Sequence, residues 1–96
     1  MTTIQFLSEP CTLAFAKYQN GRVGILLYSR VGEPMGKATV NLPGVPMAED
    51  EIAIKNYSEN EGMLESLTAA GIVSEPRRYV LNGLVSIPIC RLLVRE

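Results

Sequence analysis

Residues 57–64 read YSENEGML and gather carboxylates, an amide and a hydroxyl around a glycine. Such a run suits an acid–base pair, a metal ion, a helix start or a surface for a partner. Paired carboxylates hydrolyse glycosides when they face each other across a cleft. Glu59 and Glu61 lie two positions apart, so on a helix they point in different directions. The spacing therefore does not favour catalysis.

The other polar clusters lack the spacing of an ion or nucleotide site. The acidic runs at 49–51 and 59–61 do not match the alternating aspartates and glycine of a calcium loop. The sequence contains neither Gly-x-Gly-x-x-Gly nor Gly-Lys-Ser/Thr, the two common phosphate-binding loops. It has no histidine, which removes the usual general base and almost every zinc site. We therefore expect no enzyme activity, no metal and no cofactor.

The two cysteines, Cys11 and Cys90, are far apart and do not form a Cys-x-x-Cys motif. The N-terminal residues lack the basic and apolar regions of a secretory signal, so we expect a cytoplasmic protein. Two cysteines could form one disulfide, but thiols stay reduced in that compartment, so we expect both to be reduced and buried. No apolar run approaches the roughly 18 residues of a membrane helix, so no membrane partner is expected.

The opening run also carries the signature of a helix start. Ser58 with Glu61 three residues later predicts a capping box, in which each side chain bonds the other residue's backbone N–H. Apolar residues then recur at helical spacing, and Gly71 suits the position just past a helix end. We therefore predict a helix over residues 59–70. Gly62 inside it either costs about 1 kcal/mol relative to alanine or marks a close backbone approach. The residues expected to cover a sheet are Met63, Leu64 and Leu67.

Alternating apolar residues predict strands along the first half of the chain. Asn20-Gly21 separates two such runs and predicts a hairpin with a type I′ turn. Pro10 is expected to end the first strand, at a sheet edge. A second turn is predicted at 32–36, and a loop rich in proline and glycine at 43–48. The predicted strands lie at residues 2–8, 12–18, 23–28 and 37–42.

The second half adds further strands around the helix. Asn82-Gly83 is another hairpin signal, and Pro88 predicts that the last strand is an edge, bulged or bent. No repeat or linker divides the chain, so residues 1–96 are expected to form one domain. We predict an α+β fold, an antiparallel sheet of five to seven strands with one short helix on one face. The strands of this half lie at residues 51–57, 78–81 and 85–94.

Charge is unevenly distributed along the chain. Residues 49–65 hold six acidic residues against Lys55, a net −5, whereas each flank carries +2. Such a segment is either a solvated face or a docking surface for a protein partner with a basic surface. The basic residues are scattered, so direct nucleic-acid contact is not expected. Tyr57 fits an aromatic anchor and a core position equally well. The candidate partner-binding residues are Glu49, Asp50, Glu51, Tyr57, Glu59, Asn60 and Glu61.

Three segments resemble a family of small bacterial domains of unknown function. They are a Thr-Val-Asn-Leu-Pro stretch at 39–43, a Lys-Asn-Tyr-Ser-Glu-Asn-x-Gly segment at 55–62, and a closing NGLVSIPICRL at 82–92. The likeness covers about residues 12–93. The family is typical of phages, conjugative elements and genomic islands, which carry many small proteins that inhibit host defences.

The resemblance implies two alternative functions. The first is an anti-defence protein, most concretely an anti-CRISPR inhibitor, whose acidic 49–65 region docks on a CRISPR effector subunit and blocks DNA recruitment or cleavage. The second is an accessory module of a mobile element, acting as an adaptor or as a homodimer through an exposed sheet edge. An enzyme ranks below both, since no motif of the family carries known chemistry.

Overall fold

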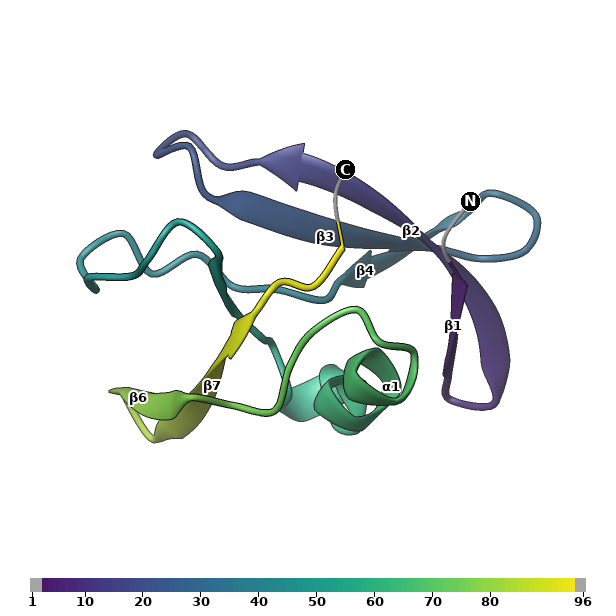
Figure 1. Cartoon of the computed structure of the whole chain (residues 1–96). Coiled ribbons are helices and arrows are strands. Elements are labelled where there is room, and N and C mark those ends of the chain that lie inside the picture. The colour runs from purple at the N-terminus through teal and green to yellow at the C-terminus, as the bar shows by residue number, and fades with distance from the viewer. Residues whose placement is uncertain (1–2, 95–96) are drawn as a thin grey trace.

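The computed structural model describes residues 3–94 and has an α+β fold, as predicted (Figure 1). Seven strands form two antiparallel sheets rather than one, with orders β1-β2-β3-β4 and β5-β7-β6. The short helices lie between β5 and β6 in the sequence. The elements are β1 Thr3–Phe6, β2 Glu9–Lys17, β3 Val23–Tyr28, β4 Pro34–Lys37, β5 Glu51–Ala53, η1 Ser58–Asn60 (a 3-10 helix), α1 Met63–Ala69, β6 Arg78–Asn82 and β7 Val85–Arg91.

The first strand is an edge strand, as expected, although residue 2 of the predicted range lies outside the described residues. Pro10 does not separate it from the next strand, because β2 already begins at Glu9. Leu7 and Ser8 alone connect β1 to β2, with φ values of 53° and 64°. Left-handed backbone at both positions is the geometry of a tight hairpin, but neither residue type signals it.

The hairpin around Asn20-Gly21 is confirmed, but its turn type is not. The Tyr18 N–H donates to Arg22 O at 2.8 Å, and the Gly21 N–H donates to Tyr18 O at 2.9 Å. Gly21 has a φ of +85°, whereas Asn20 is not left-handed. The connection is therefore a three-residue loop that ends in a left-handed glycine, the next most common hairpin form after the two-residue turns.

The next hairpin repeats this loop and places β4 earlier than predicted. The Ser29 N–H donates to Glu33 O, and the Gly32 N–H donates to Ser29 O. The turn therefore ends before Pro34, and the strand occupies 34–37 instead of 37–42. Residues 38–40 instead link the two sheets. The Ala38 N–H bonds Ile25 O in β3, while Ala38 O accepts from the Lys55 N–H beyond β5.

The hairpin around Asn82-Gly83 is also confirmed, but its second strand is central and not an edge. Proline lacks the N–H that a central strand normally donates. Pro88 is tolerated because its C=O accepts from the Ile54 N–H, one residue beyond the end of β5. The N–H that Pro88 lacks would have pointed toward Ile54, just past the end of β5, so no hydrogen bond within the β5–β7 ladder is lost. β5 is also shorter than the predicted strand at 51–57.

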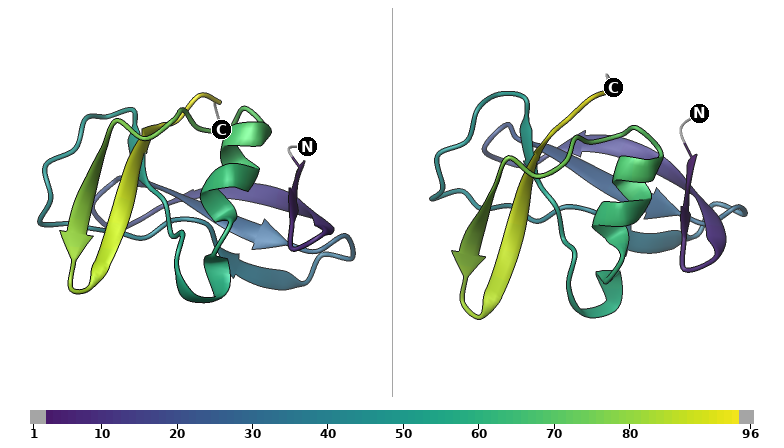
Figure 2. Two further views of the ribbon diagram at one scale, coloured as in Figure 1. Left: turned by 90° about the horizontal axis from the view of Figure 1, so that it is seen from below. Right: turned by 60° about the horizontal axis from the view of Figure 1, so that its bottom comes forward.

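The core has two parts, on opposite faces of the second sheet. Ile52 and Cys90 join the larger cluster, with the inner face of the first sheet, whereas Ala53 and Ile89 join the smaller cluster beneath residues 40–47. α1 lies below the first sheet, between β1 and the β6–β7 hairpin (Figures 1 and 2). The helix covers the larger cluster as predicted, through Met63 and Leu67, with Leu64 partly buried.

Candidate interaction surfaces

The YSENEGML run does not form one continuous helix. Gly62 separates η1 from α1 with a φ of +96°, a conformation that side-chain-bearing residues rarely adopt. A Cβ at Gly62 would meet nothing within 4 Å, so the glycine serves the backbone conformation and not a close approach. The capping-box prediction is therefore wrong, since Glu61 lies before the break and Ser58 caps no helix with its side chain. Asn56 supplies the bond instead, accepting from the Leu64 N–H at 2.8 Å.

Asn60 is wrong as a partner contact, because its side chain is buried at 4% exposure. Its Nδ2 donates to the backbone carbonyl of Lys37, which ties η1 to the end of β4. A buried amide with a bonded partner stabilises the fold and is not available to another protein. The burial of Asn60 could not be predicted from its residue type, because the carbonyl that accepts its hydrogen bond lies 23 residues away in the sequence.

The tip around η1 retains exposed carboxylates. The Lys55 ammonium lies 2.7 Å from Glu59 and 5.8 Å from the centroid of the Tyr57 ring. The hydrogen bond to Glu59 raises the pKa of Lys55, and the same bond lowers the pKa of Glu59. Tyr57 packs against the smaller core cluster, as its expected core position requires, and remains partly exposed. Glu61 is exposed.

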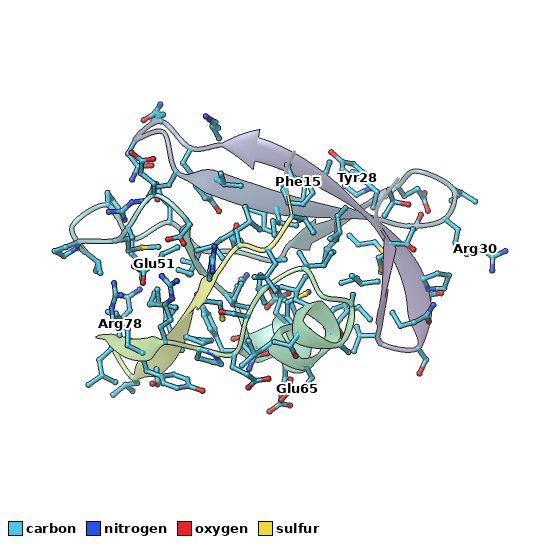
Figure 3. The ribbon with its side chains drawn as sticks, in the orientation of Figure 1. Phe15, Tyr28, Arg30, Glu51, Glu65 and Arg78 are labelled. Atoms are coloured by element: carbon cyan, nitrogen blue, oxygen red, sulfur yellow. The ribbon has the colours of Figure 1, made fainter. Side chains whose placement is uncertain are left out.

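Two of the three acidic residues at 49–51, where β5 begins, pair with arginines from the last third of the chain. Asp50 lies 3.4 Å from Arg77 and 3.2 Å from Arg91. Glu51 is 2.9 Å from Arg78 and only 6% of its side chain is exposed (Figure 3). These five residues form what we call the arginine–carboxylate cluster. The net charge of −5 for residues 49–65 therefore overstates the acidity of this surface, because the arginines of the cluster lie outside that segment.

Glu51 is the anchor of this cluster. Its Oε1 accepts from the Ala48 N–H at 2.9 Å, and this backbone bond is the largest cause that lowers the pKa of Glu51, followed by the bond from Arg78. Arg78 also donates to Pro46 O, so the cluster holds the 46–51 loop against β6. Glu51 therefore acts as a structural residue, while Glu49 remains exposed.

The candidate residues do not gather into one surface. Glu49 and Glu51 line a hollow beside the β2–β3 loop, whereas Tyr57 and Glu59 line another beside β4. Outside the arginine–carboxylate cluster the accessible residues are Glu49, Tyr57, Glu59 and Glu61, and within it Asp50 remains 44% exposed. They are too few and too dispersed to form an acidic docking face by themselves.

A different surface stands out on the β6–β7 hairpin, which projects from the body of the protein (Figure 2). Tyr79, Leu81 and Leu84 are 59%, 77% and 104% exposed, and we call them the β6 surface. Val80, between them, packs against the smaller core cluster. β6 thus presents apolar side chains on both faces. The sequence RYVLNGL contains this signal, since it lacks the polar alternation of a half-solvated strand.

The backbone of β6 is also open to a partner. Pro88 turns its C=O toward Ile54 and has no N–H, so the opposing Tyr79 belongs to a non-bonded pair of the β6–β7 ladder. Bonded and non-bonded pairs alternate along an antiparallel ladder. Tyr79 and Leu81 therefore direct their N–H and C=O groups away from β7, along the free edge of the sheet. Unpaired edge groups of this kind are a template for strand addition.

The two cysteine thiols are shielded from solvent. Cys11 and Cys90 are both buried and free. Burial raises the pKa of the Cys90 thiol to about 11, and burial also raises the pKa of Cys11. Across residues 3–94, no three acidic or cysteine side chains gather as metal ligands. None of the helices in that range is long and apolar enough to cross a membrane.

Comparison of the chain with protein-family models, with curated proteins and with solved structures finds no match.

Proposed function

We propose that this protein acts by binding another protein and carries no chemistry of its own. The observation that supports this is the β6 surface, where three large apolar side chains flank an unpaired strand edge. Fully burying one leucine side chain contributes about 1.5–3 kcal/mol. Apolar side chains beside an open strand edge match strand addition, in which main-chain hydrogen bonds give affinity and side chains give specificity.

The target that we propose is a CRISPR effector subunit, and the role is inhibition of DNA recruitment or cleavage. This target follows from the resemblance to domains of phages and mobile elements. The β6 surface would form the buried centre of the contact. The exposed carboxylates Glu49, Glu59 and Glu61 lie outside that centre, where charges steer a basic partner and contribute little affinity.

A matched pair of substitutions tests this proposal. Leu81→Lys places a charge on the β6 surface, whereas Val31→Lys alters a residue that is 81% exposed in the β3–β4 loop. We expect wild type and Val31→Lys to retain purified effector in a pull-down and to restore phage plaques. Leu81→Lys should lose about 2 kcal/mol of binding, roughly 30-fold in affinity. Absence of effector binding and of plaque rescue by wild type would refute the CRISPR target.

The second candidate is an adaptor or homodimer that pairs through β6. It is favoured by the outward backbone groups of Tyr79 and Leu81, because antiparallel pairing about Val80 sets Tyr79 against Leu81 of a second copy. Such an interface is isologous and joins the two three-stranded sheets into one. Light scattering after size exclusion should then give a dimer for wild type and a monomer for Leu81→Lys. A wild-type monomer at all accessible concentrations would exclude this alternative.

A further inference from the structure

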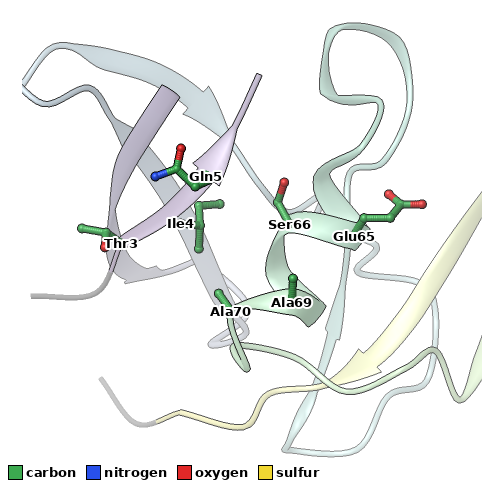
Figure 4. Close-up of a pocket in the computed structure, with 7 residues that line it drawn as sticks. All are labelled: Thr3, Ile4, Gln5, Glu65, Ser66, Ala69 and Ala70. Carbon is green, nitrogen blue, oxygen red and sulfur yellow. The ribbon is translucent and has the colours of Figure 1, made fainter. Parts of the chain in front are cut away.

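A second open edge lies at the other side of the helix. Strand β1 and helix α1 flank a groove of about 490 Å³ (Figure 4). Gln5 and Thr3 lie on the strand side, and Ser66, Ala69 and Ala70 lie on the helix side. Apart from Glu65, the helix side contributes only small side chains to the groove.

On the strand side, backbone groups of β1 have no hydrogen-bond partner within residues 3–94. Gln5 lies opposite Pro10 in the β1–β2 ladder, and Pro10 has no N–H to donate. The two-residue turn at 7–8 is flanked by a bonded pair, so the next pair, Gln5–Pro10, is non-bonded, and the alternation of the ladder makes Thr3–Thr12 another. Thr3 and Gln5 thus direct N–H and C=O groups away from β2, on the side of the groove. Their spacing along the strand, about 7 Å, matches alternate residues of an added strand.

The charge of the groove indicates what would fill it. Of its seven lining residues only Glu65 is charged, and Glu65 forms no ion pair within residues 3–94. Helix α1, with the sequence MLESLTA, contains no basic residue. A bound strand would therefore bring small apolar side chains toward the alanines and a lysine or arginine toward Glu65.

We propose that this groove binds an extended, basic segment of a partner protein, which adds to the first sheet as a fifth strand beside β1. Main-chain hydrogen bonds to Thr3 and Gln5 supply affinity, and Glu65 with the small helix residues selects the side chains. This is β-strand addition into a strand–helix groove. The inference is independent of the β6 surface, which belongs to the other sheet.

The test uses the full chain, labelled with ¹⁵N, and a short blocked lysine–valine peptide in which lysine and valine alternate along one face of the strand and threonine fills the other. We expect the amide signals of β1 and of α1 to shift on titration. The amides of Thr3 and Gln5 should also become protected from hydrogen exchange. A glutamate–valine peptide and an N-methylated lysine–valine peptide, which lacks the donors, should not bind.

Variants separate the groove from other sites. Ala69→Arg fills the groove at an exposed helix position and should weaken binding at least about tenfold. Glu65→Lys should weaken it about two- to fivefold, the range of one exposed ion pair, while Glu33→Lys at an exposed position outside the groove should not.

Leu81→Lys should leave peptide binding unchanged, so failure of the groove and failure of the β6 surface are distinguishable. Three results would overturn the proposal. They are no shifts in β1, equal binding of the acidic peptide, or equal effects of the Glu65 and Glu33 variants. The last two comparisons decide the matter even if Ala69→Arg fails to fold.

Discussion

Substituting Gly62 by alanine would raise the free energy of unfolding if residues 59–70 formed one continuous helix, and would lower it if Gly62 separates η1 from α1. In a continuous helix over 59–70, alanine would be the better residue and would raise the free energy of unfolding by about 1 kcal/mol. In the structure Gly62 has a φ of +96°, so a Cβ there strains the backbone by about 1–3 kcal/mol. Nothing lies within 4 Å of that Cβ, so no steric clash adds to the strain.

Urea denaturation of wild type and Gly62→Ala measures this difference. We expect the variant to lose about 1–2 kcal/mol, with a fall of several degrees in Tm for a domain of this size. Gly44→Ala is the matched control, because Gly44 also has open space around it but is not left-handed. That control should be neutral or slightly stabilising. A Gly62→Ala variant more stable than wild type would refute the division of the helix.

Other measurements check the packing around the candidate surfaces. Asn60→Leu removes the donor to Lys37 O and should destabilise the protein by about 1–3 kcal/mol in urea denaturation, whereas an exposed Asn60 would tolerate the change. The pKa of Glu51 is lowered in the folded state, so its stabilisation is present above the ordinary value of 4.5 and is lost as the pH falls through the lower folded value. Acid titration of unfolding should therefore show a smaller loss for Glu51→Gln than for wild type, and equal losses would contradict the arginine–carboxylate cluster. Cys11 and Cys90 should react with a thiol reagent only on unfolding, which fast labelling of the native protein would disprove.

Local signals predicted much of the fold correctly. The two Asn-Gly pairs located their hairpins because a left-handed glycine is needed close to each strand end. The helix residues Met63 and Leu67 were recognisable from their spacing alone. The Leu7-Ser8 turn was not recognisable, because neither residue type is selected for positive φ.

The candidate site was harder to predict because its determinants are distant in the sequence. Asp50 and Glu51 meet arginines 26 to 41 residues further on, so counting local charge overestimated the acidic surface. The buried Asn60 in η1 donates to a backbone carbonyl of β4, 23 residues away in the sequence. Whether β6 lies at an edge depends on strand order, which spacing does not determine.

Hydrogen–deuterium exchange of the protein with and without a purified CRISPR effector tests the central proposal most directly. We expect protection of residues 78–85 in the complex, retained by Val31→Lys and abolished by Leu81→Lys. Protection confined to residues 49–61, or no protection at all, would contradict binding through the β6 surface.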